Sequence, residues 1–342
     1  MTRLVLLGGG HAHALVLLKF RDFVSTELNL SLVTPGQVHV YSGMVPGVVA
    51  GHYAAADAQI DLAQLAHDAG AELIQGRIVR LDTETKQALL ENGERVPYDY
   101  VSLNLGSVPG GLPAAAIAVK PFEGFFTRWR ELLEVGPKAP RIALVGAGAG
   151  GVEVAMAMKF ALDRRGAGGS VELFSDRLAF LPGVAARVRN ALEARSIPLH
   201  LNNTVGSGFD ATFWATGAAA LPMLRESGLK TDAGGFVLVD PSLRSVSHPD
   251  VFAVGDSASL EGVALPKSGV HAVRQAPVLA QNLKRVVRGL PMLDYVPQKA
   301  SLSLISCGGK YAIATRGNWS AEGRWAWHWK NWLDRRWIAR FR

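Results

Sequence analysis

Two glycine-rich segments, about 140 residues apart, restrict the fold of this chain more than any other feature of the sequence. The first is Leu4–His13 (LVLLGGGHAH), and the second is Ile142–Glu153 (IALVGAGAGGVE). Each begins with a short apolar run, typical of a buried parallel strand, and passes through close-set glycines into a helix-like stretch. Such a turn lets the backbone approach a pyrophosphate, which binds the free N–H groups at the start of the helix. Two such turns predict two dinucleotides on one chain, with electron transfer between them.

Length, cysteine usage and hydropathy further limit the kinds of protein to which this chain can belong. With 342 residues, the chain is long enough for two typical domains. Its one cysteine, Cys307, excludes a disulfide framework and a redox-active cysteine pair within the chain. Cys307 ends a strand-like run, so we expect it to be buried and structural. The N-terminus lacks a signal-peptide pattern and no apolar run reaches the ~20 residues of a membrane span, so we expect a cytoplasmic protein.

The chain repeats one plan twice. Asn104–Gly106 (NLG) closes the first unit, and Ala215–Gly217 (ATG) closes the second. Between Ala71 and Gly106 the first unit has room for a β-meander, whereas the second is about 15 residues shorter between Ile197 and Gly217. We therefore predict an α/β protein with two Rossmann-like dinucleotide-binding domains, the second without its meander and inserted in the first. The glycines and proline of Tyr41–Gly47 predict a loop.

The C-terminal segment is both basic and rich in tryptophan. Part of the net charge of +7 and six of the eight tryptophans lie there. In helical register Trp325, Trp329, Leu333, Trp337 and Phe341 form an apolar stripe. The basic residues are Arg324, Lys330, Arg335, Arg336, Arg340 and Arg342; of these, Lys330 and Arg335, together with Asp334, fall away from the stripe.

A basic helix with an aromatic face is typical of contact with an anionic membrane surface. We therefore expect a peripheral protein on the inner face of a membrane. The alternative is that the helix packs on the protein's own core or on a second subunit, which leaves a homodimer open. No nucleic-acid-binding motif accompanies the aromatics, so we expect no nucleic-acid partner.

Two further motifs, Ala215–Gly217 and Val251–Asp256 (VFAVGD), stand in the order found in a known superfamily. With the two glycine loops, the chain resembles the two-dinucleotide flavoproteins that include pyridine nucleotide–disulfide reductases and type II NADH dehydrogenases. The resemblance implies FAD as cofactor, NADH or NADPH as substrate, and Asp256 at the ribitol and phosphates of FAD. It also implies a discontinuous FAD domain (1–112 and 236–300), an NAD(P)H domain (113–235), and a C-terminal interface segment with the basic aromatic helix (301–342).

A narrower resemblance rests on Gly8–His13, Tyr41–Gly47, Leu265–Gln275 and the tryptophan-rich tail. These segments are similar to type II NADH dehydrogenase-like flavoproteins, some of which are fused to a selenophosphate synthetase. This chain carries no synthetase portion.

The sequence departs from the superfamily pattern at several positions. His13 replaces the third glycine of the first loop, and Thr34 stands where an acid usually binds the FAD ribose. At the equivalent place in the second unit, Ser175 precedes Asp176 and Arg177. An acid there favours NADH, whereas serine with arginine accommodates the 2′-phosphate of NADPH, so the choice stays open.

The resemblance also concerns catalysis. Glu153 resembles a residue near the nicotinamide in relatives; its structural alternative is a first-turn acid that complements the helix dipole. Lys267 approaches the flavin or is a surface charge. His11 and His13 are expected as packing or FAD-contact residues, with no metal site. The Ala-Gln-x-Ala-x-Gln pattern of quinone-reducing relatives is Gly269–Arg274 (GVHAVR) here, without either glutamine.

We therefore expect an FAD-dependent NAD(P)H oxidoreductase in which hydride passes to FAD and electrons then reach a quinone or another small acceptor. The alternatives are an FAD reductase for a sulfur or selenium compound or a soluble electron carrier, and a flavin-bearing interaction protein that binds NAD(P)H weakly. Glu153 and Lys267 are the candidate catalytic residues. The expected cofactor-binding residues are Gly8, Gly10, His11, His13, Thr34, Ser42, Gly43, Gly106, Gly146, Gly148, Gly151, Ser175, Arg177, Gly217, Gly255, Asp256 and Gln275.

Overall fold

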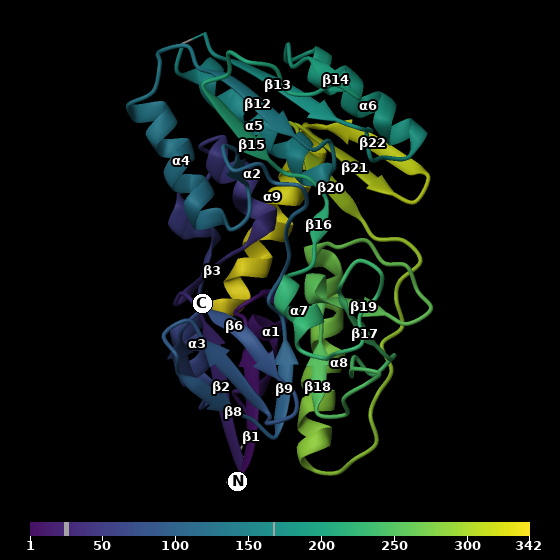
Figure 1. Ribbon diagram of the computed structural model, residues 1–342. Coiled ribbons are helices and arrows are strands. Elements are labelled where there is room, and N and C mark those ends of the chain that lie inside the picture. Colours follow the sequence, from purple (N-terminus) through teal and green to yellow (C-terminus); the bar gives the residue numbers. More distant parts are fainter. Residues whose placement is uncertain (24–26, 167) are drawn as a thin grey trace.

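The computed structural model describes residues 1–23, 27–166 and 168–342. Two five-stranded parallel sheets, each covered by helices, lie one below the other, and the yellow C-terminal helix runs between them (Figure 1). The predicted α/β fold with two Rossmann-like units is therefore confirmed.

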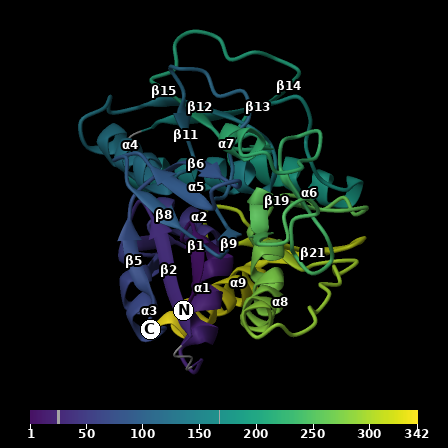
Figure 2. The same ribbon diagram turned by 60° about the horizontal axis from the view of Figure 1, so that its bottom comes forward.

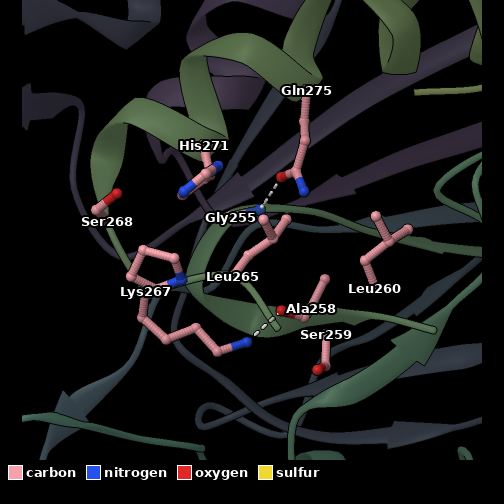
Figure 3. A pocket seen from close by; sticks show the side chains of 10 residues that line it. Gly255, Ala258, Ser259, Leu260, Leu265, Lys267, Ser268, His271 and Gln275 are labelled. Atoms are coloured by element: carbon pink, nitrogen blue, oxygen red, sulfur yellow. Dashed lines mark hydrogen bonds between the residues drawn. The ribbon is translucent and has the colours of Figure 1, made fainter. Parts of the chain in front are cut away.

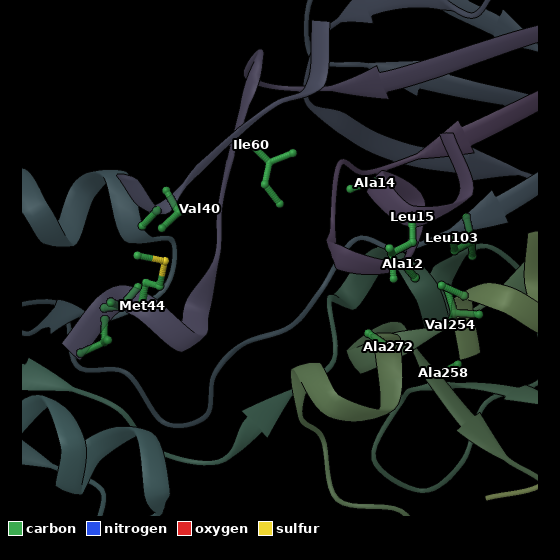
Figure 4. Close-up of a cluster of buried hydrophobic side chains, with 14 of the residues drawn as sticks. Ala12, Ala14, Leu15, Val40, Met44, Ile60, Leu103, Val254, Ala258 and Ala272 are labelled. Atoms are coloured by element: carbon green, nitrogen blue, oxygen red, sulfur yellow. The ribbon is translucent and has the colours of Figure 1, made fainter. Parts of the chain in front are cut away.

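The first sheet has the strand order β18-β9-β1-β2-β5, with β1 in its middle. Its strands are β1 (Thr2–Leu7), β2 (Leu28–Thr34), β5 (Glu72–Gln75), β9 (Tyr100–Leu103) and β18 (Val251–Ala253). Its helices are α1 (His11–Phe20), α3 (Leu62–Asp68) and α8 (Gly269–Val287). Ala12 and Leu15 of α1 lie beside Val254 and Ala272, which brings α1 against α8 (Figure 4). Since β18 and α8 follow the second sheet in the chain, the first unit is completed by late residues.

The second sheet has the order β11-β15-β12-β13-β14. Its strands are β11 (Ile117–Ala118), β12 (Arg141–Val145), β13 (Ser170–Ser175), β14 (Leu199–Leu201) and β15 (Ala211–Trp214). The accompanying helices are α4 (Phe122–Glu134), α5 (Ala149–Arg164) and α6 (Pro182–Glu193).

The two units differ before their last strand. The first carries an antiparallel meander of β6 (Ile78–Asp82), β7 (Gln87–Leu90) and β8 (Arg95–Pro97). In the second, residues 202–210, all of which are described, join β14 to β15 without a strand. Three two-stranded pairs complete the described sheets. β3 (Val38–Val40) pairs with β4 (Gln59–Asp61) and β17 (Val237–Val239) with β19 (Ala258–Leu260) within the first unit, whereas β10 (Val108–Pro109) pairs with β16 (Ala218–Ala219) of the second unit.

The expectation of a loop over Tyr41–Gly47 is wrong. The segment forms a 3₁₀ turn, η1 (Ser42–Met44), that continues into the short helix α2 (Val45–Val49). Pro46 lies in the first turn of that helix, where the missing N–H of proline is tolerated. Met44 and Val45 are buried, so tertiary packing overrides the local turn signal. The remaining short helices are η2 (Ala55–Ala58), α7 (Pro222–Glu226) and η3 (Gly255–Ser257).

The C-terminal segment connects both units. An antiparallel sheet of β20 (Ser303–Ser306), β21 (Ala312–Arg316) and β22 (Trp319–Gly323) precedes α9 (Arg324–Ile338) and the last turn, η4 (Ala339–Phe341). Arg187 of α6 pairs with Glu322 at 2.8 Å, which attaches this sheet to the second unit. Tyr53 donates a hydrogen bond to Asn331 at 2.7 Å, which attaches α9 to the first. Cys307 is fully buried between these parts, and burial raises the pKa of its thiol to about 12.

The predicted arrangement of α9 needs correction. Trp337 and Phe341, assigned to the apolar stripe, pack inside the protein, and so do Lys330 and Asp334, which we expected on another face. The tryptophans that face outward are Trp325, Trp329 and Trp332, which are 47%, 37% and 54% exposed. Helical periodicity shows which residues share a face, but not which face is turned inward. None of the described helices has the length and apolar character to cross a membrane.

Candidate functional site

The first glycine loop is shaped by the end of β9. Asn104 accepts the N–H of Ala12 at 3.1 Å and donates to the carbonyl of Val254 at 3.3 Å, so it joins α1 to β18. A Cβ on Gly8 would lie 2.5 Å from the Asn104 carbonyl oxygen, and one on Gly10 would lie 2.4 Å from its side-chain oxygen. Both glycines are therefore required for this close approach.

His13 takes the place of the third glycine in an unexpected way. In the second loop a Cβ on Gly151 would lie 1.9 Å from the Gly146 carbonyl oxygen, so only glycine fits there. In the first loop the His13 ring fills the corresponding space: Nδ1 lies 2.7 Å from the Gly8 carbonyl oxygen and Nε2 lies 2.8 Å from Ser102 Oγ. Burial lowers its pKa to about 4, which keeps the ring neutral. His13 thus connects the loop to β9 from the interior, and the structure does not bring it to the open face of the loop.

The late residues of the first unit converge on the same loop. The Gly255 N–H donates to the side-chain oxygen of Gln275 at 2.7 Å. Asp256 accepts from Ser107 Oγ at 3.0 Å and lies 3.7 Å from the Lys120 ammonium. Ser257 Oγ donates to the carbonyl of Gly106 at 3.4 Å. The structure thus brings Gly106, Gly255, Asp256 and Gln275 together beside the start of α1.

This arrangement fits FAD. Within the described part of the chain, the backbone N–H groups of Gly9 and Gly10 have no acceptor, and a Cβ on Gly106 would meet nothing within 4 Å. Free N–H groups at a helix start are donors for a pyrophosphate. The hydroxyl of Thr34, buried at the end of β2, lies 3.1 Å from where a Cβ on Gly9 would stand. This hydroxyl can donate or accept a hydrogen bond at the position where the superfamily pattern has an acid.

An aromatic and histidine cluster borders this loop on the side of α9. His11 Nδ1 lies 3.2 Å from His39 Nε2, and His11 Nε2 lies 3.4 Å from Ser42 Oγ. Burial lowers the pKa of both histidines, so both rings are neutral at pH 7. Trp337 stacks on Tyr41 with ring centroids 4.2 Å apart. The described residues contain no group of three or more His, Cys, Asp or Glu side chains placed to hold a metal ion.

The second glycine loop has an open face of its own. Gly146 has a φ of +112°, and a Cβ on Gly148 would meet nothing within 4 Å. Ser175 ends β13 and donates to the carbonyl of Arg177 at 2.9 Å, while the Arg177 side chain is exposed. Gly217, at the end of β15, is also exposed. These positions suit an NAD(P)H whose pyrophosphate sits at the start of α5 and whose ribose lies near Ser175.

Between the two loops lies a cluster of largely buried titratable side chains, here called the α9 polar cluster: Glu153, Lys330, Asp334 and Tyr41. Lys330 Nζ donates to the Gly43 carbonyl at 2.6 Å and to Asp334 at 2.7 Å, and the Tyr41 hydroxyl donates to Asp334 at 3.2 Å. Glu153 Oε1 accepts the N–H of Ser306 at 2.8 Å. Burial raises the pKa of Glu153 to about 7, with the Lys330 charge acting in the opposite direction.

Sequence reasoning missed three members of this cluster. Lys330 and Asp334 are four residues apart on one helix, which is a signal for an ion pair, but α9 turns that pair inward instead of outward. Tyr41 was assigned to a loop. The cluster joins α5 of the second unit to the first unit through α9.

Lys267 lies elsewhere, near Asp256. It donates to the carbonyl of Ala258 and stands 3.9 Å above the ring of Phe236. Figure 3 shows it beside Ser268, His271 and Gly255 around a small pocket. Burial lowers its pKa. No hydrogen bond or ion pair among the described residues joins it to the α9 polar cluster, so the two candidate catalytic residues do not form one unit.

Comparison with known proteins agrees with this geometry. The sequence profile of the pyridine nucleotide-disulphide oxidoreductases matches residues 2–276. The chain belongs to this family. It is therefore an oxidoreductase with FAD as cofactor and NAD(P)H as substrate.

Several curated relatives align over most of the chain. An alternative NAD(P)H-ubiquinone oxidoreductase of Arabidopsis thaliana is 25% identical, covering 86% of this chain and 69% of its own. The NADH dehydrogenase-like protein YutJ of Bacillus subtilis is 23% identical and covers 91% of each. Demethylphylloquinone reductase of Synechocystis is 23% identical, covering 70% and 68%.

Solved structures share the fold. The sulfide:quinone oxidoreductase of Aquifex aeolicus superposes with a TM-score of 0.83 at 16% identity, covering 100% of this chain and 92% of that one. NDH2 of Plasmodium falciparum, solved with NADH, gives a TM-score of 0.79 at 14% identity, covering 99% and 96%. The C-terminal segment is thus included in the shared architecture.

Proposed function

We propose that this protein transfers electrons from NAD(P)H, through its bound FAD, to a quinone. The observation that carries the proposal is the α9 polar cluster, a set of titratable side chains placed between the two dinucleotide sites. Two relatives support the acceptor, since one is an NAD(P)H-ubiquinone oxidoreductase and another is a demethylphylloquinone reductase; the NADH dehydrogenase-like relative supports the electron donor. The missing glutamines in Gly269–Arg274 mean that this chain holds the acceptor through other residues.

The net reaction needs one proton beyond the hydride. NAD(P)H supplies two electrons and one proton, and reduction of a quinone to a quinol takes two electrons and two protons. Bound FAD supplies the two-electron redox chemistry between the partners. We assign the second proton to Glu153. Its Oε1 accepts the N–H of Ser306, and its Oε2, which has no hydrogen-bond partner among the described residues, carries the proton. A carboxyl group with a pKa of about 7 suits both uptake and release of a proton near neutral pH.

The rest of the cluster positions that carboxyl group. Lys330 is fixed by Gly43 and Asp334, so its charge stays near Glu153 and limits the rise of the Glu153 pKa. Tyr41 holds the second oxygen of Asp334. We assign the FAD domain to 1–112 and 236–300, the NAD(P)H domain to 113–235, and the interface segment to 301–342, so this cluster lies where all three meet.

Anaerobic titration of the purified, FAD-loaded protein with NADH and then NADPH tests the proposal. We expect at least one of them to bleach the visible flavin band within seconds and a short-chain quinone to restore it. The nicotinamide that reduces the flavin at the lower concentration is the one for which the Ser175 and Arg177 region is selective. A flavin that neither nicotinamide reduces would contradict the proposal and favour the flavin-bearing interaction protein. Reoxidation of the flavin by a sulfur or selenium compound or by a soluble electron carrier, but not by a quinone, would favour an FAD reductase for such an acceptor. The resemblance to synthetase-fused flavoproteins stays a prediction.

We further propose that the outer face of α9 lies on the inner face of a membrane, where a quinone is available. Trp325, Trp329 and Trp332 point outward, and Arg336 lies 5.3 Å from the ring of Trp332. Exposed indoles next to arginines are typical of helices at the boundary between headgroups and acyl chains. The alternative proposal is that the same face of α9 forms the interface of a homodimer.

Changing Trp325, Trp329 and Trp332 together to serine is expected to weaken binding to liposomes at least about tenfold, because much of the apolar area is lost. Cosedimentation measures this. The matched control changes two exposed apolar residues of the second unit, Leu181 and Val135, to serine and should have no effect. Unchanged liposome binding, with a dimer that dissociates instead, would assign the face to subunit contact.

A further inference from the structure

A groove outside both dinucleotide sites lies between α1 and α8 and ends at the last turn of the chain. Figure 2 shows α1, α8 and the end of α9 next to one another. The groove has a volume of about 420 Å³, far above the ≈30 Å³ of one water. Its lining includes Leu15, Leu18 and Lys19 of α1, Asp22 of the turn after α1, Lys284 of α8 and Arg340 of η4. We call it the α1–α8 groove.

One cation of the groove is fixed in place. Lys284 Nζ donates to the Lys19 carbonyl at 2.6 Å and lies 4.9 Å from the ring centroids of both Phe20 and Phe23. The carbonyl and the two ring faces hold the ammonium at the C-terminal end of α1. An ammonium has three N–H donors, so two remain for a ligand.

The other charges make the groove positive. The side chains of Lys19 and Arg340 have no hydrogen-bond acceptor or ion-pair partner in the described ranges of the chain. Asp22 is the opposing carboxylate. Three cations against one anion leave an excess of two positive charges at a concave surface. Such a surface suits a phosphate, which accepts several hydrogen bonds at once.

We propose that the α1–α8 groove binds the phosphate headgroup of an anionic phospholipid. Leu15 and Leu18 provide an apolar wall beside the cations, which a free phosphate does not use but the glycerol and first acyl carbons of a lipid do. Arg340 lies in η4, the turn that follows α9, so the groove is joined through the chain to the helix whose tryptophans face outward. The inference rests on that membrane contact and adds to it a site for a particular lipid.

The test uses the full-length, FAD-loaded protein and vesicles of phosphatidylcholine with and without phosphatidylglycerol. The double variant Lys19→Gln/Arg340→Gln is expected to lose about 30-fold in affinity for the anionic vesicles, given ~1 kcal/mol for each of the two basic residues at such a surface. Asp22→Asn is expected to bind them more tightly. The control Arg130→Gln/Lys138→Gln removes the same charge from exposed positions on and after α4 and should behave as wild type.

A second measurement separates a site from general attraction. Calorimetry with dihexanoyl phosphatidylglycerol, below its micelle concentration, should show saturable one-to-one binding to the wild type that the double variant lacks. Inorganic phosphate binding as tightly as the lipid would overturn the assignment to lipid. If the wild type and the double variant bind anionic vesicles equally, the proposal that the groove binds lipid is wrong, while the proposed membrane contact of α9 is unaffected. If the wild type binds neither kind of vesicle, both proposals are wrong.

Discussion

Changing Glu153 to glutamine is expected to slow quinone reduction about 100-fold or more, the usual loss when a general acid is removed. Glutamine keeps the side-chain oxygen that accepts the Ser306 N–H, so the local structure is retained while the exchangeable proton is lost. Stopped-flow mixing of the anaerobically reduced protein with a short-chain quinone measures the effect. Reduction of the flavin by NAD(P)H, measured separately, should change much less because hydride transfer needs no carboxyl proton.

The raised pKa of Glu153 also predicts in which direction the rate of quinone reduction changes with pH. The pKa of Glu153 is raised to about 7, so the protonated form predominates below pH 7 and is lost as the pH rises. If this carboxyl group donates the second proton, the rate of quinone reduction falls about tenfold per pH unit above 7. In the Glu153→Gln variant, the rate of quinone reduction should not show this fall above pH 7. Glu131→Gln on α4, an exposed position, is the control and should leave rate and profile unchanged. A wild-type rate and profile in the Glu153 variant would remove Glu153 from the mechanism.

The features that the sequence predicted well depend on short-range rules. Gly146 and Gly151 stand where a strand must turn into a helix at very close approach, and no other residue type fits. The same rules placed the sheets of both units, because buried parallel strands form continuous apolar runs. The position of Asp256 was instead implied by the superfamily resemblance, and in the structure its motif follows β18, an edge strand of the first sheet.

The rest depended on contacts between distant parts of the chain. His13 looked like a defect in the first loop, but Ser102, on a strand almost ninety residues later, turns it into a hydrogen-bonded link. The inward direction of Lys330 and Asp334 follows from Tyr41 and Gly43, nearly three hundred residues earlier. Because α9 carries large aromatics on more than one face, its amphipathic pattern could not reveal which face the first unit covers.

The Lys330–Asp334 pair should dominate the stability of the α9 contact. The two side chains are only 12% and 7% exposed, so each charge depends on its partner. Changing Asp334 to alanine leaves the Lys330 ammonium buried, with the Gly43 carbonyl as its remaining acceptor among the described residues, and removes the acceptor of the Tyr41 hydroxyl. We expect the free energy of unfolding to fall by about 3–5 kcal/mol. Urea denaturation with FAD in excess measures it.

The double variant Lys330→Met/Asp334→Leu decides whether the lost stability comes from an uncompensated charge. Removing both charges with residues of similar volume should recover most of the loss, because neither side chain then requires a partner in the interior. Since the Lys330 charge opposes the rise of the Glu153 pKa, the same variant should move the pH limb of quinone reduction upward from about 7. A double variant as unstable as Asp334→Ala would show that packing of α9, not charge pairing, holds it to the first unit. If the stability recovers but the pH at which quinone reduction begins to slow does not change, the Lys330 charge does not influence the pKa of Glu153. The Lys330–Asp334 pair would then only link α9 structurally to the first unit.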